Sequence, residues 1–438
     1  MYKSEAHPEG FPDGGWRANL VLFGSFMGLI ADFGIANSLG AIEAYVSTHQ
    51  LKDVKQTNVS WVFSLHLGVM YFGGVFFGEL FDRFGAKRPL IAGTIIMVVG
   101  LFLTAESRRL EHFILSFGIL TAIGTSLAMS PLIGAISHWF LKKRGMACSI
   151  ATIGGLVGAS VFAVMLQKLY IDIGFKWAIR TMAFICLFCM IVSIIFVQER
   201  TSKIQNTDDE AIAFEQDPKP RPTPGSILKS CISFLRQALD FSILKEQRFV
   251  LLTLAVFLSE ITSMTTLTYL SSYALNYGVA QRNAFLLITI VNVCGIPSRL
   301  ATGILADKYG RFNVMIASSI CTTIVIFAIW LPARGNIQVL FAFGVLFGIS
   351  TSAVISLIPA CTGQICSAEN FGKVYGTMYF FLGFLTILGM YFSSLVINHG
   401  TKIDYRNFVL FEGALAFTNI IIWIWARYSS VGWKLCKF

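Results

Sequence analysis

The sequence has few charged residues for its length. Only 13% of its 438 residues are Asp, Glu, Lys or Arg, about half the share found in soluble globular domains. Hydrophobic residues make up 55% of the chain, and the mean hydropathy is +0.68. A chain with so little charge cannot cover a water-exposed surface, so the composition excludes a soluble globular protein and indicates an integral membrane protein.

The sequence also lacks the patterns that common catalytic machineries require. It contains no Gly-x4-Gly-Lys-(Ser/Thr) loop for nucleotide phosphates, and its nine cysteines show neither metal-ligand nor paired spacing. Basic residues are dispersed between apolar runs, so the net charge of +10 does not indicate a nucleic-acid partner. We therefore expect no enzyme activity, no cofactor, no metal ion and no nucleic-acid partner.

Long apolar runs dominate what the sequence does contain. A membrane-spanning helix needs about 20 mostly apolar residues. Twelve runs meet this requirement: 17–46, 59–81, 89–105, 113–138, 146–169, 177–197, 248–275, 283–306, 313–331, 337–365, 372–397 and 408–428. The first sixteen residues lack the basic start and cleavage site of a signal peptide, so we expect the first run to remain as a helix. The sequence therefore predicts an all-α integral membrane protein with twelve transmembrane helices in two six-helix bundles.

The gap between the sixth and seventh runs divides the chain. It contains three consecutive acids within 207–210 and four prolines within 217–224, a composition that excludes a spanning helix and favours a flexible linker. The expected parts are a tail over 1–16, a first bundle over 17–197, a linker over 198–247, a second bundle over 248–428 and a tail over 429–438.

Lys and Arg are distributed unevenly between the two sides of the predicted bundles. If the amino terminus is cytosolic, 22 of the 34 basic residues fall on the cytosolic side, 11 fall on the other side, and Arg299 lies within a helix. Cytosolic loops of membrane proteins carry such an excess. We expect both termini and the linker to be cytosolic, in a monomer of the plasma membrane, with the vacuolar membrane as the alternative.

One sequence motif occurs at corresponding positions of the two halves. Residues 78–85 read Gly-Glu-Leu-Phe-Asp-Arg-Phe-Gly, and residues 303–310 read Gly-Ile-Leu-Ala-Asp-Lys-Tyr-Gly. Each copy ends one apolar run and begins another, which favours a charged hairpin between two helices of a duplicated transporter over a turn with no further role. The gating residues expected from the two copies are Asp82, Arg83, Gly85, Asp307, Lys308 and Gly310.

This repeated motif resembles the loops between helices two and three and between helices eight and nine of the major facilitator superfamily. Pro12-Asp13-Gly14-Gly15-Trp16 before the first run resembles the signature of the monocarboxylate porter family, and a basic loop after Trp139 leads into a glycine-rich run in a similar way. Phe23-Gly-Ser25 and the residues after His49 look more like the fungal branch of that family, which includes a riboflavin carrier.

The resemblance also shows where this chain departs from the animal lactate carriers. Those carriers place a proton-binding lysine in helix one, where this sequence has Asn37, and an acid four residues before the substrate-binding arginine of helix eight, where it has Gly295. Arg299 matches the arginine. The resemblance therefore implies transport that is facilitative or only weakly proton-coupled.

Ionisable residues at membrane depth are costly and default to functional candidates. Arg299 offers a fixed charge to an anionic substrate, or it forms a structural ion pair with Asp32 or Glu260. His66 is expected to be a packed, hydrogen-bonded residue, and Glu412 is expected at a helix end. The predicted substrate-binding residues are Arg299, Asp32, Asn37, Glu260, Tyr269 and Tyr273.

The tyrosines of the seventh and eleventh runs can either stack on a flat substrate or anchor the helix ends at the membrane surface. Together with the intramembrane charges, they predict a secondary transporter that moves a small organic solute by alternating access. The expected solute is a monocarboxylate-like anion or a riboflavin-like metabolite. A membrane nutrient sensor that keeps the transporter fold without transport is the alternative.

Overall fold

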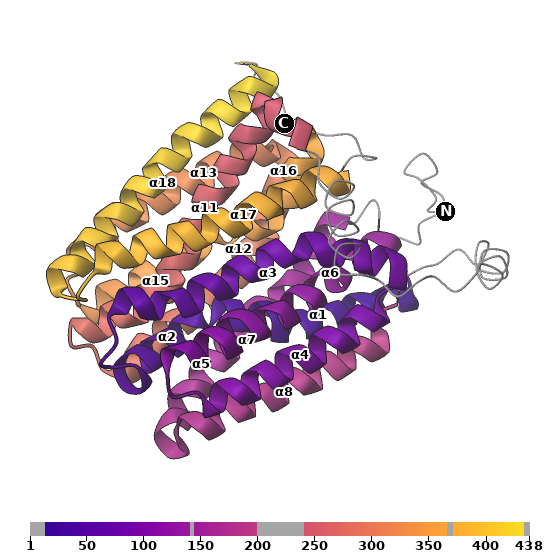
Figure 1. Cartoon of the computed structure of the whole chain (residues 1–438). Helices are drawn as coiled ribbons and strands as arrows, with labels where there is room; N and C mark the ends of the chain where they lie inside the picture. The colour runs from indigo at the N-terminus through magenta and orange to yellow at the C-terminus, as the bar shows by residue number, and fades with distance from the viewer. Residues whose placement is uncertain (1–13, 141–143, 199–240, 366–370, 433–438) are drawn as a thin grey trace.

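The computed structural model describes residues 14–140, 144–198, 241–365 and 371–432, and these residues are almost entirely helical (Figure 1). Most of the predicted linker lies outside them. The backbone at Asp82, Arg83 and Asp307 is described, but the placement of these three side chains is not.

The helices of the first half pack on one another, α1 most extensively on α7 and α8. They are α1 (Trp16–Asn37), α2 (Leu39–Tyr45), α3 (Gln56–Phe84), α4 (Lys87–Glu106), α5 (Leu110–Phe113), α6 (Ala122–Trp139), α7 (Arg144–Asp172) and α8 (Gly174–Phe196), with π-helical turns η2 (Val46–Gln50) and η3 (Ile114–Thr121). Figure 1 shows them as the indigo and magenta group.

The second half forms the orange and yellow group in the same view. It contains a short 3-10 helix η4 (Phe241–Lys245), then α11 (Gln247–Asn276), α12 (Gln281–Tyr309), α13 (Arg311–Val325), the π-helical turn η5 (Ile326–Trp330), α14 (Leu331–Ala333), α15 (Ile337–Thr351), α16 (Ala353–Ile365), α17 (Phe371–Ile397) and α18 (Lys402–Val431). Here α11 packs on α17 and α18, and α12 packs on α15.

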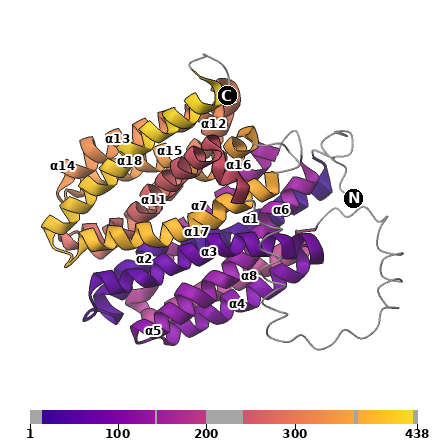
Figure 2. The ribbon, with the colours of Figure 1, turned by 45° about the horizontal axis from the view of Figure 1, so that its top comes forward.

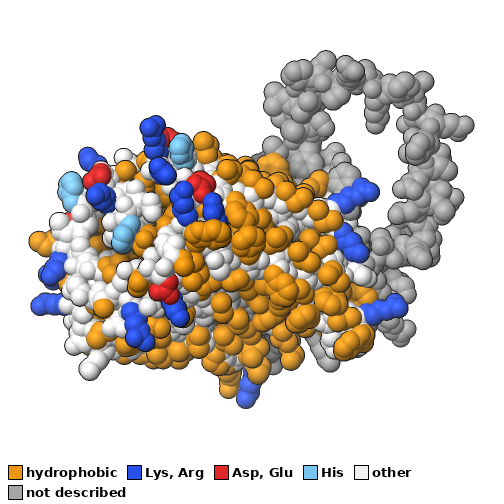
Figure 3. All heavy atoms as spheres, turned by 90° about the horizontal axis from the view of Figure 1, so that it is seen from below, with side chains coloured by type: hydrophobic (Ala, Val, Ile, Leu, Met, Phe, Trp, Pro, Cys, Tyr) orange, Lys and Arg blue, Asp and Glu red, His pale blue; other side chains and the backbone are white. Residues whose placement is uncertain are grey.

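Within the described residues, eleven helical stretches are long and apolar enough to cross a membrane. The predicted run 59–81 corresponds to the 29-residue helix α3, which makes twelve long helical stretches in the part of the chain that the structure describes. The face seen in Figure 3 carries a broad belt of apolar side chains, with most of its charges near the two ends. Large apolar residues such as Ile95, Phe188 and Ile304 are more than half exposed, as expected for a surface that faces lipid. The protein is therefore a multi-pass membrane protein.

Several predicted helices have other bounds in the structure, and two of the differences have a visible cause. The run 17–46 is divided at Ser38, whose hydroxyl bonds to the carbonyl oxygen of Ile35 at 3.1 Å. The last helix begins at Lys402 and not at 408, because Thr401 and Asp404 form a reciprocal capping box before the apolar run starts. Glu412 consequently lies in the interior of α18, and its prediction at a helix end is wrong.

The two repeated hairpins have the backbone conformation that their glycines predict. Gly85, after α3, has a φ of 76°, and Gly310, after α12, has a φ of 95°. Residues with a side chain rarely adopt such angles, so glycine is required at both turns. Lys308 is exposed, with its Nζ 5.3 Å from the centre of the Tyr309 ring. The gating roles of these residues stay predictions.

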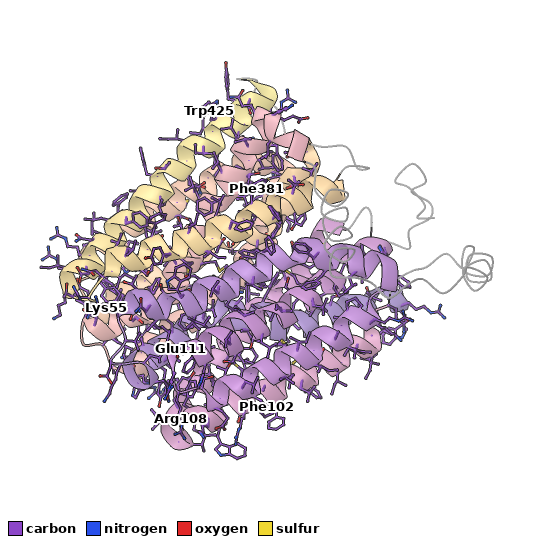
Figure 4. The ribbon with its side chains drawn as sticks, viewed as in Figure 1. Lys55, Phe102, Arg108, Glu111, Phe381 and Trp425 are labelled. Carbon is purple, nitrogen blue, oxygen red and sulfur yellow. The ribbon has the colours of Figure 1, made fainter. Side chains whose placement is uncertain are left out.

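The two ends of the bundle differ in what they contain. The start of α1 and the end of α18 lie at one end of the bundle, which we call the terminal end, while α2, α5 and α14 lie at the opposite end, which we call the distal end (Figures 1 and 2). Figure 4 shows Lys55, Arg108 and Glu111 at the distal end. Beside them Glu106 accepts hydrogen bonds at 2.6 Å from both Lys176 and Arg180, which ties α4 to α8.

Candidate substrate site between the two halves

The two halves meet most extensively along three pairs of helices: α2 with α11, α3 with α17, and α7 with α12. The α3 and α17 backbones approach closely, because a Cβ added at Gly383 would lie 2.8 Å from the main-chain nitrogen of Phe72. Ser60 donates a hydrogen bond to Ser394 at 2.8 Å across the same pair. A substrate site built from both halves therefore has to lie among these helices.

Glu260 lies in the middle of α11 and is 3% exposed. The hydroxyl of Tyr71, from α3 in the other half, donates a hydrogen bond to its Oε2 at 3.2 Å. The Tyr379 ring lies 5.7 Å from the Tyr71 ring, edge to face, and the Tyr375 ring lies 4.7 Å from Tyr379. One buried carboxylate on α11 thus lies beside a group of three tyrosine rings from α3 and α17.

Arg299 lies in α12, two residues after Pro297, and its side chain is buried. Its Nη1 donates to the carbonyl oxygen of Thr152 on α7 at 3.0 Å, and its Nε donates to that of Ser352 at 3.2 Å. Ser352 lies between α15 and α16, where the carbonyl groups of an ending helix lack partners within it. The arginine therefore joins the first half to this helix break.

Arg299 makes no ion pair with an acid in the described part of the chain, although the Glu260 carboxylate is close enough for the two charges to interact. Its Nη2 atom donates to no described group. The described residues thus use two of the five N–H donors of the guanidinium. The role of Arg299 in substrate binding stays a prediction.

Asp32 is fully buried, and neither of its carboxylate oxygens has a hydrogen-bond partner among the described residues. It lies one helical turn after Gly28, where an added Cβ would meet the side chains of Leu132 on α6 and Ser193 on α8. Residues four apart share a helix face, so Asp32 is directed into the first half and away from Arg299.

Asn37 ends α1 and is 3% exposed. Its Nδ2 would lie 3.5 Å from a Cβ added at Gly155 of α7, so this side chain also packs within the first half. The substrate-binding roles of Asp32 and Asn37 stay predictions.

Tyr273 packs within the second half, whereas Tyr269 contacts the second half and also lies beside Ser60 of the first half. The Tyr269 ring meets the Phe408 ring edge to face at 5.6 Å. Tyr273 lies among aromatic rings of its own half, with Trp330 at 5.5 Å and Tyr405 at 5.9 Å. The structure therefore does not bring these two tyrosines to the Glu260 cluster, and their role in stacking on a substrate stays a prediction.

The predicted packing of His66 is confirmed. Its Nδ1 lies 2.9 Å from the carbonyl oxygen of Phe117, and its ring stacks on the Phe117 ring at 4.6 Å. Two other buried acids make contacts inside the protein, and only the first of them, Glu412, was singled out from the sequence. Glu412 accepts hydrogen bonds from Thr265 at 2.8 Å and Ser393 at 3.3 Å, and Glu43 accepts hydrogen bonds from Gln56 and Ser272.

The sequence reasoning also missed Tyr71 as a partner of Glu260. An acid within an apolar run, as at Glu43, is a signal that the sequence contains. The pairing of Tyr71 with Glu260 leaves no such signal, because the two residues are 189 positions apart.

Comparison with known proteins gives three results. The sequence matches the model of the Major Facilitator Superfamily over residues 20–337 and 252–434. It is 38% identical to the riboflavin transporter MCH5 of Saccharomyces cerevisiae over 438 residues, which covers 98% of this chain and 82% of that protein. It is 30% identical to the MFS transporter asaE of Aspergillus flavus, over 98% of this chain and 91% of that protein.

Among solved structures, the nucleoside transporter NupG has a similar fold. Its crystal structure superposes with a TM-score of 0.68 at 15% sequence identity and covers 93% of this chain and 100% of that chain. At this identity the similarity shows the fold alone.

Proposed function

Because this chain belongs to the Major Facilitator Superfamily and is a membrane transporter of that type, we propose that it carries a flat, riboflavin-like metabolite by alternating access. The observation that carries the proposal is the cluster of Tyr71, Tyr375 and Tyr379 around Glu260. Tyrosine rings stack on flat ring systems, and a carboxylate accepts hydrogen bonds from ring N–H and from hydroxyl groups. The 38% identity to a riboflavin transporter supports the same substrate class.

A monocarboxylate-like anion is the second candidate, favoured by the Nη2 atom of Arg299, which donates to no described group. Such an anion would meet the carboxylate of Glu260 at the tyrosine cluster, and like charges at close range are unfavourable. The observed arrangement therefore supports the flat neutral ring more strongly.

The direct test is uptake of labelled riboflavin and, separately, of labelled lactate into liposomes that contain the purified protein. We expect saturable uptake of riboflavin that unlabelled riboflavin inhibits. Lactate uptake without riboflavin uptake would favour the second candidate. Riboflavin binding without flux of either compound would contradict a transporter and favour a sensor.

We expect riboflavin uptake to change less than about twofold when an inward proton gradient is imposed, because Asn37 cannot titrate and Gly295 provides no carboxylate. The measurement is the initial rate of uptake with and without the gradient, at equal internal volume. Accumulation that requires the gradient and disappears with a protonophore would contradict this prediction and assign proton transfer to a buried acid such as Glu260.

Replacing Glu260 with glutamine should weaken riboflavin binding by about tenfold, because a hydrogen bond to a charged group is worth about 1.5–3 kcal/mol. Replacing Tyr379 with leucine should weaken it by a similar factor through loss of a stacking surface. The control is Phe392→Leu, on the same helix α17 but exposed at the outer surface, which should bind as the wild type does. Unchanged affinity in the Glu260 and Tyr379 variants would place the substrate elsewhere.

We also propose that both termini and the linker are cytosolic, which the 22-to-11 distribution of basic residues supports. A cysteine introduced by Glu215→Cys should react with a membrane-impermeant reagent only after the cells are opened. Reaction from outside intact cells would reverse the orientation.

A further inference from the structure

A fully buried carboxylate lies at the distal end, where α2 of the first half meets α11 of the second. Glu43 is 0% exposed. Its Oε1 accepts a hydrogen bond from Gln56 at the start of α3, and its Oε2 accepts one from Ser272 on α11. One oxygen is thus bonded within its own half of the protein, and the other is bonded across the contact between the halves.

The surroundings of Glu43 are closed to water in this structure. One turn earlier, Gly40 lies against α11 so closely that a Cβ would come within 2.1 Å of the carbonyl oxygen of Leu267. Farther along the same end, the ring of Trp61 lies 4.9 Å from that of Tyr391 across α3 and α17. The structure therefore shows the distal end closed.

Opening the distal end has different effects on the two hydrogen bonds. Gln56 belongs to the same half as Glu43 and can keep its bond when the halves separate, whereas Ser272 moves away with the second half. In the open state, water can replace the serine hydroxyl. In the closed state the site is dry, and a carboxylate oxygen without a donor there is strongly unfavourable. The Ser272 bond therefore stabilises the closed state selectively, which is how a contact shifts a conformational equilibrium.

We propose that Glu43 and Ser272 form the latch of the distal gate. The hydrogen bond between them sets the balance between distal-closed and distal-open states, so Glu43 is a functional residue of the transport cycle without contacting the substrate at the tyrosine cluster. The proposal rests on alternating access between the two halves, and it does not depend on which solute is carried.

Hydrogen-deuterium exchange of the full chain in lipid nanodiscs, without substrate, tests the latch. Ser272→Ala should raise the exchange rate about tenfold in the distal segments 39–50 and 265–277, since the closed state then leaves a buried acceptor without its donor. Exchange at the terminal-end segment 144–160 should stay at the wild-type rate. Ser272→Thr keeps the hydroxyl and should restore the wild-type pattern.

The matched control is Gln56→Ala, which removes a donor to the same carboxylate that comes from the first half. Because that bond lies within one half, we expect faster exchange near the start of α3 and no change over 265–277. An equal increase over 265–277 in both alanine variants would make Glu43 a structural acid and overturn the latch. Wild-type exchange in Ser272→Ala, or an increase that extends to 144–160, would also overturn it. Failure of riboflavin flux alone would leave these results unaffected.

Discussion

Replacing Gly40 with alanine should reduce transport by roughly ten- to a hundredfold while the protein still folds and reaches the membrane. The added Cβ would lie 2.1 Å from the main-chain oxygen of Leu267 and 3.0 Å from that of Thr268. Main-chain atoms of a packed helix cannot move aside as a flexible side chain can, and overpacking of this kind costs about 1–3 kcal/mol. Since the clash exists only when α2 and α11 touch, it destabilises the distal-closed state. Uptake and surface expression measured together check the prediction.

Two other glycines provide controls for this variant. Gly158 approaches the carbonyl oxygen of Ile30 equally closely, at 2.1 Å for an added Cβ, but both residues belong to the first half. Gly158→Ala should therefore lower expression and thermal stability. Gly344→Ala meets nothing nearer than 3.4 Å and should behave as the wild type. If Gly40→Ala loses stability as Gly158→Ala does, the close approach at Gly40 is needed for folding and not only for closure.

Replacing Arg299 with alanine should nearly abolish transport, and replacing it with lysine should weaken substrate binding. The guanidinium is a planar fork that can donate in several directions at once, whereas an ammonium group is a compact charge on a flexible chain. In the structure two of its donors hold the carbonyl oxygens of Thr152 and Ser352, and the Nη2 arm donates to no described group. Lysine cannot reproduce this arrangement. Uptake and expression of both variants, measured in parallel, check the prediction.

The interpretation of Arg299 as a purely structural ion pair makes a different prediction. If the arginine served only to neutralise a buried acid, Arg299→Ala would misfold, and a second change, Glu260→Gln or Asp32→Asn, would restore folding. We expect no such rescue, because the hydrogen bonds of Arg299 go to main-chain carbonyl groups. Arg180→Ala, which removes a partly exposed partner of Glu106, is the control for loss of a positive charge and should transport normally.

Much of the fold could be predicted because each membrane helix must be long and apolar, a property of contiguous residues. The helix ends were predicted less well, since polar capping residues such as Thr401 and Asp404 start a helix outside its apolar run. Glu260 and Arg299 could be singled out because charges are rare at membrane depth. The direction in which a buried side chain points could not be predicted. Asp32 faces α6 and α8, and no amphipathic stripe reveals this when every face of a helix is apolar.

Contacts between the two halves could not be predicted from the sequence for another reason. The bond from Tyr71 to Glu260 joins residues 189 positions apart, and the bond from Ser272 to Glu43 joins residues 229 positions apart. Which residues meet is decided by how α3 and α2 pack against α11 and α17, and this packing follows from close approaches at glycines such as Gly40. No local pattern encodes such a pairing.

The choice of acceptors for Arg299 affects how the sequence can diverge. If Arg299 were paired with a carboxylate, the two positions would be coupled in evolution, and a change at one would require a compensating change at the other. Main-chain carbonyl groups exist whatever side chain is attached, so a change of side chain at position 152 or 352 leaves the acceptor itself in place. Only a change that displaces the backbone itself, such as proline in the middle of α7, would break the contact. Most substitutions at positions 152 and 352 therefore leave these two hydrogen bonds possible, and only the arginine at position 299 must be kept.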